Sequence, residues 1–275
     1  MWKWLSVVLG AIALLGLLGY WFATGGIPNR NPAAWLTAQL IAHRGQWAEG
    51  PARPENSLAA FDEAARSGNA VELDVQLTAD GKVVVFHDDD LERMTGESGT
   101  VSEMSLAELR TVRLLGGDQR IPTLSEALAV IGRRVPVFVE IKNRGSVGAL
   151  EDEVAREVAA YSGDAAVMSF NPYSLSRVAA ATPQIQRGQL SSAFRGEDLP
   201  FYQVFLLRNL LMNWTSKPDF IAHDLQALPS LGTRIQRWRG RPLLGWTVED
   251  MGQRAAAAEF CDGLICNPGA LPTSN

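Results

Sequence analysis

From residue 39 to residue 265 the chain alternates short apolar runs, which resemble strands, with amphipathic stretches that resemble helices. The strand-like runs cover residues 39–45, 71–77, 82–88, 135–142, 165–170, 188–191, 220–225, 242–248 and 262–265. Such alternation is typical of a parallel sheet covered by helices. With 275 residues, of which 47% are hydrophobic, the chain can bury one large core. The pattern predicts an α/β fold, a TIM-type (β/α)8 barrel, as a single domain over residues 39–275.

The N-terminal segment has the length and composition of a membrane-spanning helix. An almost unbroken apolar run covers residues 5–22 and is bordered by Lys3 and by aromatic residues. About 20 apolar residues can cross about 30 Å of hydrocarbon, and aromatic side chains favour the two interfaces. A cleaved signal peptide is the alternative, but its apolar region usually has about 7 to 15 residues and ends in small side chains. We expect a transmembrane anchor over 1–24 and a turn-rich linker over 25–38.

The positive residues beside the anchor bear on its orientation. Lys3 precedes the apolar run, whereas Arg30 and Arg44 follow it. Positive residues close to a spanning helix tend to stay in the cytoplasm. Lys3 favours a cytoplasmic N-terminus, and the two arginines oppose it. We expect a single-pass membrane protein whose barrel lies outside the cytoplasm.

Charge and cysteine content exclude some classes of protein. The net charge is −5 and the isoelectric point is near 5.3. A nucleic-acid-binding domain usually carries a basic patch, so no nucleic-acid partner is expected. Cys261 and Cys266 lie in apolar surroundings near the C-terminus, which favours two buried thiols over a disulfide or a metal-binding pair.

The most informative stretch is 71–88, which indicates two strands joined by a turn at Ala79-Asp80-Gly81. Residues two apart on a strand share a face, so Glu72 and Asp74 point the same way. Like charges at close range resist joint ionisation, so a cation is expected between them. Oxygen ligands suit Mg²⁺ or Ca²⁺ better than zinc. The turn is too short for a crossover helix, so the second strand either forms a hairpin or joins the barrel irregularly.

Two other segments depart from the alternation. Residues 89–119 are polar and contain several glycines, which favours a small excursion over the site after the third strand. Residues 201–214 are more apolar than a surface helix requires and contain no acidic residue. They are expected to form a helix that either packs on the barrel or rests on the bilayer surface.

Further ionisable residues follow other strands. Glu140 and Lys142 form a second period-2 pair, and the three histidines, His43, His87 and His223, all end predicted strands. In barrels and α/β sheets ligands bind at the carboxyl ends of the strands. We expect the groups that converge there to form a site; they are His43, Arg44, Glu72, Asp74, His87, Glu140 and Lys142.

The charges of this group indicate its ligands. Three carboxylates would bind a divalent cation, which leaves Arg44 and Lys142 to bind an anion such as a phosphate. Two histidines beside the phosphate suit general acid–base catalysis, because an imidazole can accept or donate a proton at neutral pH. The sequence contains no P-loop, Gly-x-Gly-x-x-Gly or Gly-x-Ser-x-Gly motif, which argues against the NTPase, dinucleotide-binding and α/β-hydrolase classes.

These residues lie within a longer series of motifs that resembles the glycerophosphodiester phosphodiesterase family. The resemblance extends from about residue 40 to residue 270, in the family's order. The motifs are His43-Arg44-Gly45, Pro54-Glu55-Asn56-Ser57, Glu72-Leu73-Asp74-Val75, Thr78-Ala79-Asp80-Gly81, His87-Asp88, Ile121-Pro122-Thr123-Leu124, Glu140-Ile141-Lys142, Trp246-Thr247-Val248 and Asp262-Gly263-Leu264-Ile265.

The resemblance implies a TIM-type barrel with an excursion after the His-Asp motif, and it implies a role for each site residue. His43 and His87 would be the acid–base pair. The ligands of one divalent cation, Mg²⁺ or Ca²⁺, would be Glu72, Asp74 and Glu140. Substrate binding would involve Arg44 and Lys142 at the phosphate, Glu55 and Asn56 as supports, and Trp246 on the glycerol side of the mouth.

Two positions depart from the family pattern. The family often ends its last strand with Thr-Asp, where this chain has Cys266-Asn267, and it often has asparagine where this chain has Glu249. The first departure puts a contact at the rim of the site in doubt. Neither departure changes the implied catalytic residues.

The implied reaction is metal-dependent hydrolysis of a glycerophosphodiester to glycerol 3-phosphate and an alcohol. The anchor and residues 201–214 add the possibility of a lysophospholipid substrate, which would give a lysophosphatidic acid. One alternative is a phosphodiesterase similar to the phosphoinositide-type phospholipases C. The other is a membrane-tethered protein that binds phosphodiesters without catalysis.

Overall fold

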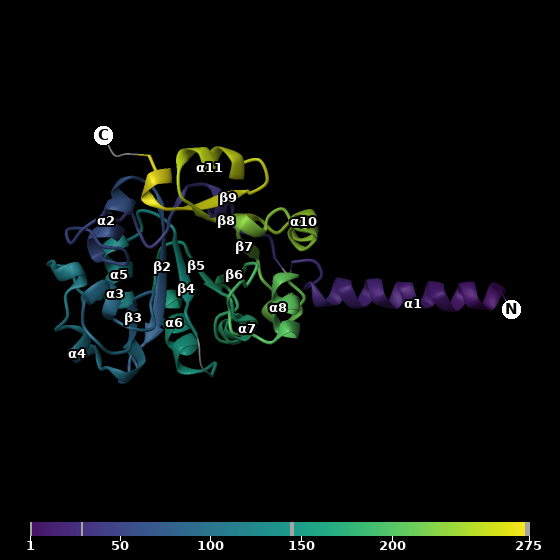
Figure 1. The fold of residues 1–275 in the computed structure, drawn as a ribbon, viewed down its shortest axis with the longest axis horizontal. Coiled ribbons are helices and arrows are strands. Elements are labelled where there is room, and N and C mark those ends of the chain that lie inside the picture. The colour runs from purple at the N-terminus through teal and green to yellow at the C-terminus, as the bar shows by residue number, and fades with distance from the viewer. Residues whose placement is uncertain (1, 29, 144–145, 273–275) are drawn as a thin grey trace.

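A closed barrel of parallel strands forms the centre of the computed structural model, which describes residues 2–28, 30–143 and 146–272 (Figure 1). The strands are β1 (Ile41–Ala42), β2 (Ala70–Leu77), β3 (Val83–Val85), β4 (Val137–Ile141), β5 (Ala165–Ser169), β6 (Gln186–Ser191), β7 (Phe220–Asp224), β8 (Leu243–Val248) and β9 (Gly263–Cys266). Their order is β1-β9-β8-β7-β6-β5-β4-β2-β3, and a pairing between β1 and β2 closes the ring. All pairs are parallel except β2 with β3, so the expected TIM-type barrel is confirmed.

Helices surround the barrel (Figure 1). The α-helices are α1 (Trp2–Ala23), α2 (Leu58–Arg66), α3 (Glu92–Thr95), α4 (Leu106–Leu109), α5 (Leu124–Ile131), α6 (Ala149–Ala160), α7 (Pro172–Ala181), α8 (Phe201–Arg208), α9 (Asn213–Ser216), α10 (Leu231–Trp238) and α11 (Met251–Ala257). The short 3₁₀ helices are η1 (Ala34–Thr37), η2 (Val101–Glu103), η3 (Leu114–Gly116), η4 (Leu225–Ala227) and η5 (Pro268–Ala270). α2 and α5 begin with side-chain caps, since the hydroxyls of Ser57 and Thr123 accept backbone N–H groups of the first turn.

Strand alternation divides the core into two layers. On β4, Val137 and Val139 face outward and pack against the surrounding helices, whereas Phe138 faces the interior of the barrel. The interior cluster near the amino ends of the strands includes Phe138, Phe220 and Leu36 of η1, all fully buried. Apolar side chains therefore fill the base of the barrel, and polar ones are left for its mouth.

The hairpin alternative is confirmed for the stretch after β2. β3 pairs antiparallel with β2 through a turn in which Gly81 has φ of 74°, a conformation that glycine adopts without strain. The expected excursion after the third strand, residues 89–119, is present, but it is more than a polar segment. It contains α3 and α4 and packs a small core of its own against β3, formed by Val84, Phe86, Leu91, Met94, Val101, Leu109, Leu114 and Ile121.

The expectation of one helix over 201–214 is wrong. The chain forms α8 and then α9, and Leu210 between them has φ of 57°. The left-handed conformation breaks the helix and turns the Leu210 side chain inward, where it is 1% exposed. All eight residues of α8 remain at least partly exposed.

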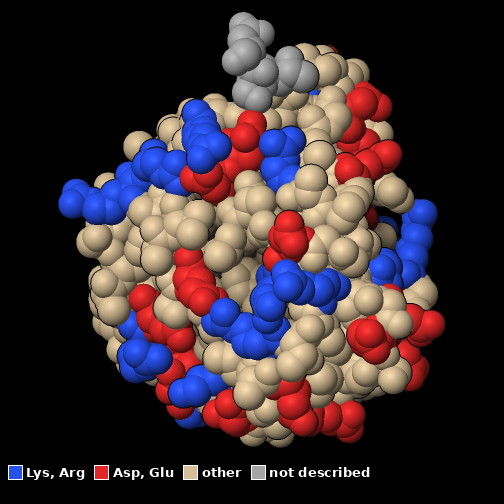
Figure 2. Space-filling model, turned by 90° about the vertical axis from the view of Figure 1, so that its left-hand side faces the viewer, with Lys and Arg blue, Asp and Glu red and all other residues tan. Residues whose placement is uncertain are grey.

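The apolar N-terminal run forms α1, which projects from the barrel (Figure 1). Residues Trp4–Ala23 have a mean hydropathy of 2.1 and are long and apolar enough to cross a membrane. The opposite face of the molecule carries interspersed acidic and basic side chains (Figure 2). As expected, Cys261 and Cys266 are free, buried thiols.

Candidate active site

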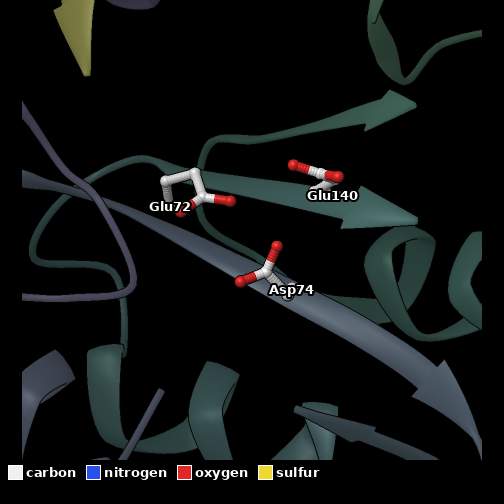
Figure 3. A group of neighbouring side chains, drawn as sticks. All are labelled: Glu72, Asp74 and Glu140. Carbon is white, nitrogen blue, oxygen red and sulfur yellow. The ribbon is translucent and has the colours of Figure 1, made fainter. Parts of the chain in front are cut away.

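Three carboxylates meet inside the barrel, above its apolar base. Glu72 and Asp74 project inward from β2, and Glu140 projects inward from β4, where it pairs with Asp74 in register. One oxygen from each carboxylate lies within 4.8 Å of the others (Figure 3). The period-2 pairs of the sequence therefore place three carboxylate groups around one point.

The electrostatics of this trio suit a cation. Glu72 is 2% exposed, and its Oε1 has no hydrogen-bond partner among the described residues. Burial, together with the charges of Asp74 and Glu140, raises the pKa of Glu72 well above its usual value. Burial also raises the pKa of Glu140. A divalent cation would remove this repulsion and give Oε1 of Glu72 a partner, so the residues fit a Mg²⁺ or Ca²⁺ ion.

Arg44 and Lys142 are both paired with these carboxylates, contrary to the expectation that they would be left free for an anion. Lys142 Nζ lies 2.7 Å from Oε1 of Glu140 and 3.2 Å from Oδ1 of Asp74. Arg44 Nε lies 3.5 Å from Oδ2 of Asp74. Burial alone would raise the pKa of Asp74, but Lys142, His87 and Arg44 together lower it.

The balance of charge at the centre favours a metal and a phosphodiester together. With all three carboxylates ionised, as a bound cation would require, the trio and the two basic side chains carry one net negative charge. A divalent ion would change this to one positive charge, and a phosphodiester monoanion would then neutralise it. Lys142 and Arg44 could turn towards that phosphate while remaining close to the carboxylates.

Glu55 and Asn56 support the site from the segment that precedes α2. Asn56 Nδ2 donates to Oδ2 of Asp74 at 2.9 Å, and Asn56 is 2% exposed. Glu55 Oε1 accepts from Nη1 of Arg44 at 2.8 Å and from Nη2 of Arg93 at 2.6 Å. The backbone N–H of Arg44 also donates to Oε2 of Glu72 at 2.9 Å. These contacts fix the orientation of the carboxylates and of the Arg44 side chain.

His43 follows β1 and is held by an amide. Its Nδ1 lies 2.7 Å from Oδ1 of Asn267, and Nδ2 of Asn267 donates to Oε2 of Glu249 at 2.7 Å. A carboxylate only accepts, so it fixes the orientation of the Asn267 amide and requires His43 to carry its proton on Nδ1. Burial, with the nearby Arg44, lowers the pKa of His43 to about 4. Nε2 of His43 is therefore a free base at neutral pH.

His87 follows β3 and has a charged partner instead. Its Nδ1 lies 2.7 Å from Oδ1 of Asp88, whose Oδ2 accepts from Nε of Arg93 at 2.5 Å. Burial lowers the pKa of His87, and the charge of Asp74 opposes this effect. The charge of Asp74 acts to raise the pKa of both His43 and His87, so both imidazoles lie near this carboxylate. An imidazole bound to a carboxylate holds its proton more readily than one bound to an amide.

Trp246 of β8 lies on an aromatic wall. Its ring centroid is 5.7 Å from that of Phe170, which follows β5, and Phe170 lies 5.9 Å from Phe194, which follows β6. Nε1 of Trp246 is buried and has no hydrogen-bond partner among the described residues. The three rings form a continuous apolar surface beside the carboxyl ends of β5, β6 and β8.

Sequence reasoning missed several residues that contact the site. Asn267 and Glu249 were noted only as departures from the family pattern, and no signal suggested that they join His43. Asp88 belongs to the His87-Asp88 motif, but the sequence suggests no role for it. No sequence pattern points to Arg93, Phe170 or Phe194. His223 does not join the site, because it lies on the outer face of β7 with Ile221.

Comparison with known proteins identifies the family of this chain. The model of the glycerophosphoryl diester phosphodiesterase family matches residues 43–267. The Bacillus subtilis protein YhdW, assigned by its name to the glycerophosphodiester phosphodiesterases, is 32% identical over 240 residues, which cover 82% of this chain and 93% of YhdW. A glycerophosphodiester phosphodiesterase from Caldanaerobacter subterraneus is 36% identical over 165 residues, or 55% of this chain and 65% of that protein.

Solved structures show the same fold. A phosphodiesterase from Oleispira antarctica, in complex with the product sn-glycerol-3-phosphate, superposes with a TM-score of 0.69 at 26% identity, covering 86% of this chain and 95% of that one. A glycerophosphodiester phosphodiesterase from Thermotoga maritima superposes with a TM-score of 0.65 at 27% identity, covering 84% and 95%. The chain belongs to the glycerophosphoryl diester phosphodiesterase family and is a phosphoric diester hydrolase.

Proposed function

We propose that the protein hydrolyses glycerophosphodiesters to glycerol 3-phosphate and an alcohol with the help of one divalent cation. The observation that carries the metal dependence is the buried trio of Glu72, Asp74 and Glu140, with one Glu72 oxygen that has no hydrogen-bond partner in the described part of the chain. The complex of the Oleispira antarctica relative with glycerol 3-phosphate supports the product. The ion, Mg²⁺ or Ca²⁺, would supply a Lewis acid that stabilises negative charge on the phosphoryl oxygens.

The residues around the ion would divide the chemistry between them. Arg44 and Lys142 would bind the phosphoryl oxygens and stabilise the charge that develops there. His43, neutral and free at Nε2, would accept the proton of the attacking oxygen. His87, which is paired with Asp88, would donate a proton to the leaving alkoxide. Trp246 would line the glycerol side, with Glu55 and Asn56 holding Arg44 and Asp74 in place.

The membrane association is part of the proposal. Residues 1–24 would form a single-pass anchor, 25–38 the linker and 39–275 the catalytic domain, which would lie outside the cytoplasm. The exposed aromatic residues of α8 support a lysophospholipid as a second substrate class, with a lysophosphatidic acid as product. A phosphodiesterase of the phosphoinositide phospholipase C type would instead leave a cyclic phosphate as its end product.

A substrate panel with several divalent ions tests the proposal. The detergent-solubilised protein would receive soluble glycerophosphodiesters and lysophospholipids, with Mg²⁺, Ca²⁺ or a chelator. We expect hydrolysis that stops with the chelator and a fall of about 10² to 10⁴ in rate for His43→Ala and His87→Ala. Activity confined to soluble diesters would remove the lysophospholipid class.

The control is His223→Ala, which removes the histidine outside the site and should retain most of the activity. Thermal melting of each variant would separate loss of catalysis from loss of folding. Wild-type protein that binds the diester but never turns it over would support a non-catalytic binding protein and refute the proposal.

A further inference from the structure

The end of α1 is built into the barrel domain. Thr24 is fully buried; its carbonyl oxygen accepts from Nε2 of Gln236 at 3.0 Å and from Nη1 of Arg239 at 3.2 Å. The buried Arg241 donates to the carbonyl oxygens of Gly25 and Gly26 at 3.1 and 2.9 Å. These donors precede β8, so the attachment lies at the amino ends of the strands. The helix is thus fixed to the barrel rather than joined to it by a flexible tether.

Aromatic contacts extend this attachment to both sides of α1. Trp21 packs edge-on against Trp238 of α10 at 6.1 Å between ring centroids, and the guanidinium of Arg239 lies 3.9 Å from the centre of the Trp21 ring. Phe22 stacks on Trp214 of α9 at 5.9 Å. The surface of the anchor is therefore continuous with that of α9 and α10.

The helices beside α1 expose large apolar side chains to an unusual extent. We call the surface that they form the anchor-side face; α8 and α10 lie on the side of the barrel from which α1 projects (Figure 1). Its members are Phe201 (83% exposed), Tyr202 (59%), Phe205 (50%), Trp214 (42%), Leu231 (71%) and Trp238 (76%). Clustered exposure of this kind marks an interaction surface.

The charges favour a lipid surface as the partner. The chain has no acidic residue from 199 to 218, although the exposed Glu197 and Asp198 come just before this stretch; Arg208, Lys217 and Arg234 are exposed in or next to α8, α9 and α10. The opposite face carries both signs of charge (Figure 2). Aromatic rings together with basic side chains are typical of surfaces that rest in the headgroup region. A protein partner would not explain why this face adjoins the C-terminal end of α1, a helix long enough to cross a membrane.

We propose that the anchor-side face lies on the bilayer, so that the barrel rests on its side. This rests on the proposed membrane anchor but not on the proposed reaction. Each barrel helix begins at the mouth and returns to the base, so Phe201 and Leu231 lie near the mouth, while Trp214 and Trp238 lie near the base. The face therefore extends over the height of the barrel and brings the β6–β7 rim of the mouth to the lipid surface. Phe194 of the aromatic wall lies in the connection from β6 to α8.

Site-specific fluorescence on the full chain tests this orientation. Phe205→Cys in α8 and Leu231→Cys in α10 would each be labelled with an environment-sensitive dye and reconstituted into phosphatidylcholine–phosphatidylglycerol vesicles. A doxyl spin label near the lipid headgroup would serve as quencher. We expect several-fold stronger quenching at both positions than at Asp118→Cys, a fully exposed residue of the excursion.

The outcomes test two points separately: whether α1 anchors the protein in the membrane, and whether the anchor-side face lies on the bilayer. Failure of the full chain to float with the vesicles would refute the anchor and the docking together. Flotation with quenching at neither position, or at only one, would refute the side-lying orientation alone. A label at residue 205 that is shielded from water yet not quenched would place a second copy or another protein on this face, and would also refute it.

Discussion

The side-chain oxygen of Asn267 lies 2.7 Å from Nδ1 of His43, although 224 positions separate the two residues. They meet because β1 and β9 are neighbours, so the residues that follow both strands lie side by side. Glu249 holds the amide from its other end. The arrangement gives His43 a neutral partner, which raises the pKa of the imidazole less than a carboxylate would, so burial keeps it the unprotonated base that a proton acceptor requires.

Replacing this neutral partner by a carboxylate should change the pH dependence of catalysis. His43 has a pKa of about 4, so it stays an active base as the pH falls towards that value. In Asn267→Asp the new charge would stabilise the imidazolium and raise this pKa by about one unit or more. The acidic limb of kcat/KM should therefore move to higher pH, with Asn31→Asp in the exposed linker as control. Superimposable profiles would show that Asn267 does not govern His43.

Glu140→Gln should weaken metal binding as well as catalysis. The change keeps the size of the side chain but removes one of three negative charges from the centre. We expect Mg²⁺ or Ca²⁺ affinity and kcat/KM each to fall by at least about tenfold, as for other changes at metal sites. Calorimetric titration with each ion would measure the affinity, with Glu97→Gln as an exposed control. Unaltered metal affinity would show that Glu140 is not a ligand.

Arg241→Met should destabilise the fold. Arg241 is 2% exposed and donates to Pro218, Gln236, Gly25 and Gly26. Without the guanidinium these buried oxygens lose their donors, which should cost about 3 kcal/mol in the free energy of unfolding. Urea denaturation in detergent would measure the change, and the exposed Arg234→Met should have almost none. Equal urea midpoints for Arg241→Met and Arg234→Met would contradict this account of how α1 is fixed to the barrel.

The two cysteines should be unreactive in the folded protein. Burial raises the pKa of both Cys261 and Cys266 to about 12. At pH 7.5 the thiolate, the reactive form, would then be only on the order of 10⁻⁴ to 10⁻⁵ of each residue. A maleimide should label neither thiol before unfolding and both after it, as mass spectrometry would show. Rapid labelling of the native protein would mean that one thiol reaches solvent.

Local patterns in the sequence were enough to predict the barrel and its carboxylates. The period of a strand predicts that Glu72 and Asp74 share one face, and the Ala79-Asp80-Gly81 signal predicts the tight turn between β2 and β3. These features depend on neighbours within a few residues, so the sequence contains them directly.

The features that sequence reasoning missed depend on contacts between distant segments. The pairing of Asn267 with His43 requires the closure of the barrel, and the contacts of Thr24 with Arg239 join segments 215 residues apart. The break at Leu210 reflects burial of one side chain rather than a helix-breaking residue. The engagement of Lys142 by two carboxylates likewise appears only when β2 and β4 are side by side.

The strand that closes the barrel is also its shortest. β1 has two residues, Ile41 and Ala42, and pairs with both β2 and β9. His43 and Arg44 follow it directly, and the backbone N–H of His43 donates to the carbonyl oxygen of Cys266 on β9. If β1 separates from β2 and β9 on heating, His43 loses its contact with Asn267 and Arg44 loses its contact with Glu72 in the same step. Thermal inactivation and opening of the ring would then be one event, with no inactive intermediate that keeps the ring closed.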